Sequence, residues 1–460
     1  MRLQNWAKAL LVLWPALCSQ AVAEEEPTSV HLGLNEAREV ALTALRSGQP
    51  KLAFALSDGL VQADSKDGHA LYIKAKSLGQ MQDFDGGRKV AAKAYRVAST
   101  DLQHYESAML AAQLSFARAR MTHSQIWLRR AIHHAPSSEF RDATISAFRQ
   151  VRRQNPVSAQ LRVLVSPSNN INNGANSPFN IIDGLPLPPG MLSASARAVS
   201  GVSATVTASG AYRFQEDETS ESRIVARIYS RNVAFNEAVP NLSSSDLSAQ
   251  RAQVGLAHII APGGKGFWRF DINGGRAWYG GDPFFNFASF SAQRVQRISN
   301  NIRLSLSGGW EFQDDLQFPY FDSRVWSGNA AFTYNLKNGS SLSANFIYRD
   351  VITDIANRDS EQYTALFRYN HGRTIGKAKI GVEIGRSVLD FDQYGFGALF
   401  LAPGGRTDKA WFGQISATFQ SISYMGFVPV VTLRSESSRS NVSRFDVDQT
   451  GVSVGIRSEF

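Results

Sequence analysis

Cysteine is almost absent from this sequence, because its 460 residues contain only Cys18. That residue lies in MRLQNWAKALLVLWPALCSQAVA, a basic start followed by an apolar run. Such a run, closed by small residues like Ala21 and Ala23, is typical of a secretory signal peptide. We therefore expect residues 1–23 to be removed. The mature chain is then an exported protein without disulfide or thiol chemistry.

A lipoprotein signal is the alternative interpretation of the same run, with Cys18 as the lipidated residue. Leu17 stands where that processing requires a small residue. The sequence therefore favours ordinary signal cleavage. The run is also too short to span a bilayer stably as a helix.

Strong charge of either sign is lacking too. The formal net charge is +9, and it falls to +7 once Arg2 and Lys8 leave with the signal. This value is mild for a chain of this length and gives no case for a nucleic-acid partner, which the exported compartment also excludes.

Motifs for catalysis or cofactor binding are missing as well. His258 and His371 are the only histidines in the second part of the chain, and neither stands beside a serine nucleophile in a recognisable frame. His133 and His134 have no carboxylate or further histidine at ligand spacing, so we expect them to be solvated. The glycine-rich turn at Ala261 does not continue as a nucleotide-binding loop. We expect no enzyme activity, no cofactor and no metal.

The composition changes near Pro156. Before it the chain is rich in Ala, Leu, Gln, Lys and Arg, whereas Gly, Ser, Asn and aromatic residues dominate after it. This change predicts an α + β protein, with a helical domain over residues 24–156 and a strand domain over residues 157–460.

Small residues recur through the helical domain. Apolar residues return every three or four positions, and alanines stand at spacings of 34 and 37, at Ala41, Ala75 and Ala112 and again at Ala94 and Ala131. Pro136 stands in the usual closing place of a repeat. The pattern resembles tetratricopeptide (TPR) repeats, in which alanine lets paired helices approach closely. An irregular helical bundle is the alternative.

Basic residues gather at the end of the helical domain, where few acidic residues accompany them. We expect this cluster to contact protein cargo or the head groups of outer-membrane lipids, and a solvated helix face is the alternative. The candidate contact residues are Arg118, Arg120, Arg129, Arg130, Arg149, Arg152 and Arg153.

Period-two alternation governs the rest of the chain. Apolar and aromatic residues alternate with small or polar ones, as in a strand that faces lipid on one side and a wet lumen on the other. The pattern predicts a transmembrane barrel of fourteen antiparallel strands. We expect them near 159–166, 196–214, 220–235, 248–261, 266–279, 286–299, 301–313, 323–336, 341–351, 361–371, 378–391, 409–420, 425–436 and 446–460.

The links between these strands alternate in length. Every second link is short, like KNGS, and the others are mostly longer, like QYGFGALFLAPGGRTD. Short periplasmic turns and long outer loops are typical of outer-membrane barrels. We therefore expect an outer-membrane protein with its helical domain in the periplasm. Aromatic girdles are expected at Trp268, Trp278, Trp310, Trp326, Trp411 and Tyr424.

The final strand resembles the signal that the barrel-assembly machinery reads. Ser453, Gly455 and the terminal Phe460 match its polar residue, glycine and final aromatic. Ser458 stands where a further aromatic is usual. We expect the assembly machinery to be a partner.

Together these features resemble one family, the surface lipoprotein assembly modifiers, also called Slam. Residues 166–174, SPSNNINNG, are similar to the Asn-Ile-Asn stretch that ends that family's first strand. Residues 200–214 are similar to its second strand and residues 439–460 to its closing hairpin. The resemblance covers nearly the whole mature chain. Ser168 and Asn169 stand where the family often has an acidic residue, which leaves a different cargo open.

This resemblance implies a translocator that delivers surface lipoproteins, or related secreted proteins, across the outer membrane. It brings no catalytic residues with it. A polysaccharide exporter is the main alternative, because such exporters also place TPR repeats before a barrel. A passive porin is a third possibility, but it leaves the helical domain unexplained.

Overall fold

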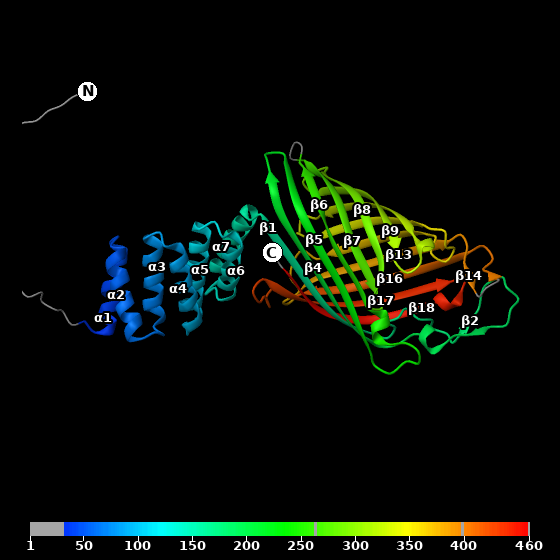
Figure 1. Ribbon diagram of the computed structural model, residues 1–460, viewed down its shortest axis with the longest axis horizontal. Helices are drawn as coiled ribbons and strands as arrows, with labels where there is room; N and C mark the ends of the chain where they lie inside the picture. The colour runs from blue at the N-terminus through cyan, green and yellow to red at the C-terminus, as the bar shows by residue number, and fades with distance from the viewer. Residues whose placement is uncertain (1–31, 262–264, 397–399, 459–460) are drawn as a thin grey trace, which may run out of the picture.

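The computed structural model describes residues 32–261, 265–396 and 400–458. In these residues, seven helices precede a closed antiparallel barrel of fourteen strands (Figure 1). The predicted fold class is therefore confirmed. The proposed signal peptide, with its cleavage residues Ala21 and Ala23, lies outside the described residues, as does Phe460.

The helices follow one another in a single row, and each packs on the next (Figure 1). Side chains cap several of them: Asp67, Asp83 and Thr100 each accept a hydrogen bond from the backbone of the first helical turn. The helices are α1 (Leu34–Arg46), α2 (Pro50–Ala63), α3 (Gly68–Gln80), α4 (Phe84–Val97), α5 (Asp101–Ala117), α6 (Met121–His133) and α7 (Ser138–Gln154).

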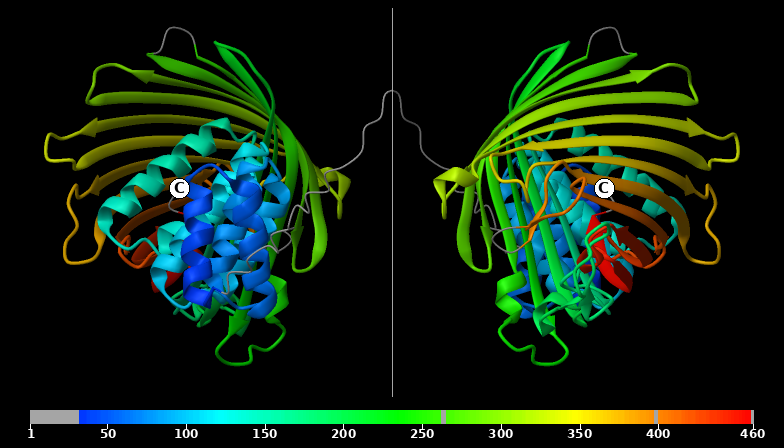
Figure 2. Two further views of the ribbon diagram at one scale, coloured as in Figure 1. Left: turned by 90° about the vertical axis from the view of Figure 1, so that its left-hand side faces the viewer. Right: turned by 90° about the vertical axis from the view of Figure 1, so that its right-hand side faces the viewer.

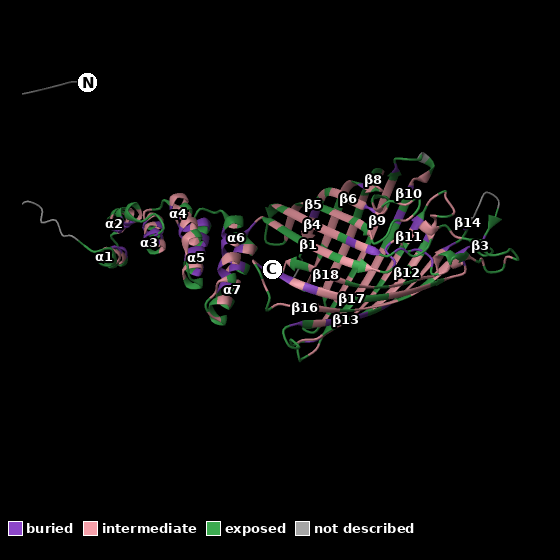
Figure 3. Ribbon diagram, turned by 90° about the horizontal axis from the view of Figure 1, so that it is seen from below, coloured by how far each residue is buried: buried purple, intermediate pink, exposed green. Residues whose placement is uncertain are grey.

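Alanine forms much of the core of this helical stack, and Figure 3 marks buried positions along its helices. The five alanines that recur in the sequence are all at most 2 % exposed, as expected where helix backbones approach closely. Larger side chains such as Leu71, Trp127 and Phe148 fill the remaining space. The sequence-based repeat pattern thus marks the interior of the stack.

The barrel closes where its first strand, β1, meets its last, β18. Its strands are β1 (Val157–Ser168), β4 (Gly201–Glu216), β5 (Ser220–Phe235), β6 (Ala249–Ile260), β7 (Gly266–Tyr279), β8 (Asp282–Arg297), β9 (Ile302–Asp315), β10 (Ser323–Asn335), β11 (Ser341–Ile352), β12 (Ser360–Asn370), β13 (Lys379–Phe391), β16 (Arg406–Thr418), β17 (Phe427–Ser440) and β18 (Val447–Ser458). Each predicted strand corresponds to one of them.

Alternation along each strand separates two faces. On β18, Val452, Val454 and Ile456 are 44 %, 53 % and 41 % exposed, whereas Ser453 and Gly455 line an interior cavity. The other strands repeat the pattern, so apolar side chains cover the outside of the barrel and polar ones line the lumen. Of the expected girdle residues, Trp268, Trp326, Trp411 and Tyr424 are exposed.

Link length differs between the two ends of the barrel. The short links, such as 336–340 and 419–426, lie at the end that faces the helices, because the link at 419–426 contacts α6 and α7. The opposite end carries most of the long links. One of its links is shorter than expected, since Gly280 and Gly281 alone join β7 to β8, both with positive φ.

Two of the long links pack together with a shorter turn at the far end of the barrel. The link after β1 contains the small hairpin β2 (Phe179–Asn180) and β3 (Gly190–Met191), and the link before β16 contains β14 (Gly395–Phe396) and β15 (Phe400–Leu401). Ile182, Tyr394 and Val442 form an apolar cluster between these links and the turn before β18. None of the described helices is long and apolar enough to cross a membrane.

Candidate functional site: the joint and the lumenal cavity

The helical stack is attached to the barrel through specific contacts, which we call the joint. Arg129 of α6 donates hydrogen bonds to the carbonyl oxygen of Met425 and to the hydroxyl oxygen of Ser458, both at 3.1 Å. Its guanidinium also lies 5.2 Å from the ring centroid of Phe148 and 5.6 Å from that of Phe427. One arginine therefore links α6 and α7 to β17, β18 and the link between β16 and β17.

Other contacts hold the same elements together. The rings of His133 and Tyr424 meet edge to face, with centroids 4.9 Å apart. Arg141 of α7 donates to the carbonyl oxygen of Gln420 at 3.4 Å. Because these contacts are spread over two helices, they fix the direction of the stack relative to the barrel. Figure 2 shows the stack in front of one end of the barrel.

The passage from α7 into β1 is also fixed. The Asn155 side-chain oxygen accepts the backbone N–H of Val157 at 3.0 Å, and its amide nitrogen donates to Gln125 at 2.6 Å. Arg213 of β4 donates to the carbonyl oxygens of Arg153 and Gln154. The two parts of the chain are thus connected by a bonded turn.

A cavity of about 480 Å³ lies at the joint, between α6, α7 and the first residues of β1. Aliphatic and aromatic side chains, including Ile126, Phe148 and Leu161, provide much of its lining. Burial lowers the pKa of the Arg129 guanidinium below its usual value, and the nearby charge of Arg152 lowers it further. The joint therefore combines an apolar recess with a concentrated positive charge.

The basic cluster predicted from sequence does not form one surface. Arg118 and Arg120 both pair with Asp85, at 3.6 and 3.2 Å. Arg130 packs its guanidinium over the ring of Trp127, 4.2 Å from its centroid. Arg149 and Arg153 are exposed, whereas Arg152 lines the joint cavity.

The proposed cargo or lipid contact of Arg129 stays a prediction, and the structure adds a second role for this residue. Its guanidinium is engaged with the barrel, over a sequence separation of 296 residues to Met425 and 329 to Ser458. The cluster of basic residues in the sequence did not predict this contact, because Met425 and Ser458 lie so far from Arg129 along the chain.

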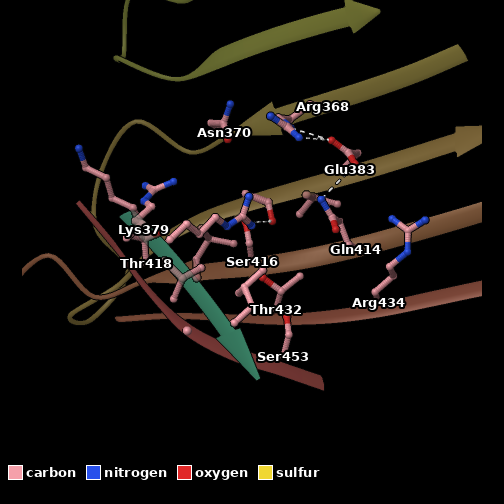
Figure 4. Close-up of a pocket in the computed structure, with 18 of the residues that line it drawn as sticks. Arg368, Asn370, Lys379, Glu383, Gln414, Ser416, Thr418, Thr432, Arg434 and Ser453 are labelled. Atoms are coloured by element: carbon pink, nitrogen blue, oxygen red, sulfur yellow. Dashed lines mark hydrogen bonds and ion pairs between the residues drawn. The ribbon is translucent and has the colours of Figure 1, made fainter. Parts of the chain in front are cut away.

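Inside the barrel, a cavity of about 570 Å³ lies against the strands that close it; we call it the lumenal cavity (Figure 4). It lies toward the end that faces the helices, because His371 and Lys379 at the turn between β12 and β13 belong to its lining. Its cationic residues are Arg162, Arg368, Lys379, Arg434 and Arg457, and Glu383 is its one carboxylate among the described residues.

The Glu383 carboxylate is paired with two neighbouring side chains. Arg368 forms an ion pair with Glu383, and the Gln414 amide donates to the second carboxylate oxygen at 3.0 Å (Figure 4). Arg162 and Arg457 stand opposite each other in the register of β1 and β18. Like charges in such positions repel, so the closing seam favours an anion nearby.

The basic character continues around the lumen. A second cavity of about 410 Å³ is lined by Arg223, Arg227 and Arg269, with Asp271 as a partner of Arg269 at 2.6 Å. Serine, asparagine and glutamine supply much of the remaining lining. The arrangement offers hydrogen-bond donors and positive charge to a polar or anionic chain.

The proposed assembly-signal residues lie next to the closing seam. Gly455 stands opposite Leu164 of β1, and a Cβ atom on it would lie 2.2 Å from the carbonyl oxygen of Val163. Only glycine therefore fits without a shift of the backbone. Ser453 faces the lumenal cavity. Their recognition by the assembly machinery stays a prediction.

The expectation that His134 lacks a carboxylate or histidine partner was wrong, and His258 has a partner on another strand. His134 has a carboxylate and a further histidine beside it, because its side chain lies near Asp101 and His104. In the barrel, the Nδ1 atom of His258 lies 2.9 Å from the Ser222 hydroxyl on the neighbouring strand. Both groups join residues more than 30 positions apart, so spacing in the sequence did not reveal them.

No family model matches the chain, and no curated protein matches it in sequence. Among solved structures, Pseudomonas putida OprB at high pH is similar at 9 % identity and a TM-score of 0.38, over 68 % of this chain and 96 % of that one. A bacterial polysaccharide outer-membrane secretin is similar at 12 % identity and a TM-score of 0.32, over 66 % and 98 %. The Yersinia enterocolitica type III secretion translocator chaperone SycD is similar at 15 % identity and a TM-score of 0.24, over 26 % and 84 %. At these scores the similarities add nothing to what the fold itself shows.

Proposed function

We propose that this protein is an outer-membrane translocator whose helical stack receives a polypeptide in the periplasm and whose barrel delivers it to the cell surface. The joint is the observation that carries this proposal. A helical stack held at one mouth of the barrel by Arg129, Arg141 and His133 is placed to hand a chain to the lumen. The closed barrel with an apolar exterior supports an outer-membrane location.

Exposed apolar side chains on the helices support a polypeptide ligand. Leu102 and Phe116 of α5 are 51 % and 37 % exposed, and Phe140 of α7 is 51 % exposed. Stacked helix pairs commonly use such residues to hold an extended segment along a continuous surface. Each contact is weak because the bound segment gives up conformational entropy, so recognition requires many of them.

The chemistry of the lumen supports an anionic or highly polar passenger. Positive charge on Arg162, Arg434 and Arg457 attracts acidic segments, and a wet polar wall does not trap them by apolar contact. Together with the resemblance in the sequence, these features favour a surface lipoprotein or a related secreted protein as the cargo.

Export of an acidic polysaccharide is the second candidate. It is favoured by one observation, the excess of arginine and lysine over carboxylates in the lumenal cavity. A neutral glycan path is less suited, because inward aromatic residues do not line this cavity among the described residues. Under this alternative the helices would bind a partner of the export machinery instead of cargo.

Deletion of residues 34–153 tests the proposal, with the signal and the barrel retained. The barrel should still fold, as measured by its heat-modifiable mobility on gels, but surface exposure of the protein encoded next to this gene should be lost. Protease shaving of intact cells measures that exposure. Normal protein display in the deletion, or a loss of exopolysaccharide alone, would favour the exporter.

A finer test replaces exposed apolar residues without touching the core. We expect Leu102→Ser combined with Phe116→Ser to lower cargo exposure, while the helical stack stays folded. Gln113→Ser, at an exposed polar position of the same helix, is the matched control. Equal surface exposure of the cargo in both variants would contradict a role for Leu102 and Phe116 in binding.

A further inference from the structure

A carboxylate and two imidazoles meet between α5 and α6, outside both sites described above. Asp101 and His104 occupy the first turn of α5, and His134 follows the last residue of α6. The His134 Nδ1 atom lies 2.8 Å from an Asp101 carboxylate oxygen. The rings of His104 and His134 are stacked, with centroids 4.5 Å apart and an angle of 15° between their planes.

The hydrogen bonds around this group set the direction of its lone pairs. The Nδ1 atom of His104 lies 2.9 Å from the carbonyl oxygen of Thr100. A carbonyl only accepts, so Nδ1 carries the proton and Nε2 keeps its lone pair. On His134, the Nε2 atom lies 3.2 Å from the Tyr95 hydroxyl, which leaves Nδ1 directed at Asp101. Such outer hydrogen bonds are what orient the histidines of metal sites.

We propose that Asp101, His104 and His134 bind one divalent transition-metal ion, with Zn²⁺ as its best representative. One ligand atom from each residue lies within 4.8 Å of the others. Two imidazole nitrogens and one carboxylate oxygen are a ligand set that suits Zn²⁺ and similar ions. Ligands around a tetrahedral Zn²⁺ stand about 3.4 Å apart, given bond lengths of about 2.0–2.1 Å. Rotation of the exposed Asp101 side chain closes the remaining gap.

The place of the site gives the ion a structural role. It joins the start of α5 to the end of α6, and the next ring along, that of His133, contacts Tyr424 of the barrel. A bound ion would therefore hold α5 and α6 together at the end of the stack that meets the barrel. Because Asp101 is exposed, water could complete the coordination of the ion.

A hydrogen-bonded ion pair between His134 and Asp101, with His104 stacked on it, is the competing explanation. Hydrogen bonding to His134 lowers the pKa of the Asp101 carboxyl, and the charges of His134 and the neighbouring histidines lower it further. That arrangement needs no metal, so direct measurement of metal binding separates the two explanations.

The test uses the full-length mature protein in detergent, prepared without a histidine tag and stripped with a chelator. Titration calorimetry with ZnCl₂ should show one ion per chain. His104→Gln and Asp101→Asn should each weaken binding at least about tenfold, because each removes one of three ligands. His123→Gln replaces a histidine of α6 outside the group and should bind like the wild type.

Co²⁺ provides a second readout. Its visible absorption should show the intense bands of a four-coordinate site in the wild type and in His123→Gln, and should lose them in His104→Gln. Heat-modifiable mobility on gels verifies that each variant is folded. The absence of stoichiometric Zn²⁺ binding, or equal binding in His104→Gln and His123→Gln, would overturn the proposal and leave the ion pair as the explanation.

Discussion

Arg129 donates a hydrogen bond to Ser458 across 3.1 Å, and so joins the sixth helix directly to the last strand of the barrel. This contact gives a physical reason for a serine where the assembly signal usually has an aromatic residue. A hydroxyl accepts the guanidinium hydrogen bond, whereas an aromatic ring does not do so in the same position. The last strand, β18, therefore contributes to the joint through Ser458 and closes the barrel by pairing with β1.

Arg129→Ala should loosen the joint without unfolding either part of the chain. Hydrogen bonds to charged groups contribute about 1.5–3 kcal/mol each. Because the hydrogen bonds of Arg129 to Met425 and Ser458 are only partly buried, we expect their loss to cost about 1.4 kcal/mol in total. That free energy corresponds to a factor of about ten in the equilibrium constant for opening of the joint. We expect protease cleavage near Asn155 to become about tenfold faster in purified protein. Arg149→Ala, at an exposed position of α7, is the control, and equal cleavage rates would contradict the role of Arg129.

The barrel could be predicted from the sequence because the alternation that indicates a strand lies within each strand. Each strand repeats an alternation such as that of Val452 and Val454, and a single strand shows it without knowledge of the others. The alanines at Ala75 and Ala112 carry a similar signal, because helix packing demands small residues at the crossing points. The fourteen strands follow from such short patterns.

The joint was beyond sequence reasoning, since its contacts depend on the final placement of distant elements. Nothing near Arg129 in the sequence points to Met425. The same holds for Asp101 and His134, whose side chains meet only after α5 and α6 have paired. A hint did exist in the helical pattern, because the start of one helix lies beside the end of the next when the two pack antiparallel.

Gly455→Ala should weaken the closing seam of the barrel. The added Cβ atom would clash with the carbonyl oxygen of Val163, and overpacking of this kind costs about 1–3 kcal/mol. We expect a lower unfolding temperature, measured by the loss of heat-modifiable mobility. Gly413→Ala is the matched control, because the nearest atom to its Cβ would lie at an ordinary 3.6 Å. The same temperature in both variants would show that the seam adapts.

Topology can be tested with single cysteines, because the mature chain is expected to contain none. Tyr320, which is 73 % exposed, lies in a link at the end of the barrel far from the helices, and Asn338 lies in a turn at the helical end. A membrane-impermeant maleimide added to intact cells should label Tyr320→Cys but not Asn338→Cys. Disruption of the outer membrane should expose Asn338→Cys as well. The reverse pattern would place the helices outside the cell.

Acid should remove the contribution of one turn at the end of the barrel that faces the helices. The Ser220 hydroxyl, with the Thr219 and Ser220 backbone N–H groups, lowers the pKa of Asp217 to about 2. Because the pKa of Asp217 is lower in the folded state, its ionised carboxylate stabilises the fold at pH values above the ordinary pKa of about 3.8. This stabilisation is lost as the pH falls through about 2. Asp217→Ala should therefore unfold at a lower temperature than the wild type at pH 5, and the difference should shrink between pH 4 and pH 2. A difference independent of pH would contradict this assignment.

Positive charge in the lumen should make the barrel selective for anions. Arg162 and Arg457 stand opposite each other at the seam and line the lumenal cavity, so together they raise the local potential for any permeating ion. In planar bilayers, the reversal potential under a KCl gradient measures this preference directly. We expect the wild type to favour chloride over potassium, and Arg162→Ser combined with Arg457→Ser to reduce that preference.

Raised salt should reduce the preference as well, because it screens charges that face water. Arg386→Ser is the matched control, since Arg386 lies over the outer-face ring of Trp411 at 5.2 Å and its charge does not face the lumen. If the lumenal pair also guides the passenger, the same double variant should slow surface delivery of an acidic cargo, while Arg386→Ser should not. Unchanged selectivity in the double variant would mean that other lumenal arginines, such as Arg434, set the potential. Cation selectivity in the wild type would contradict an electrostatic role for the lumen in either candidate function.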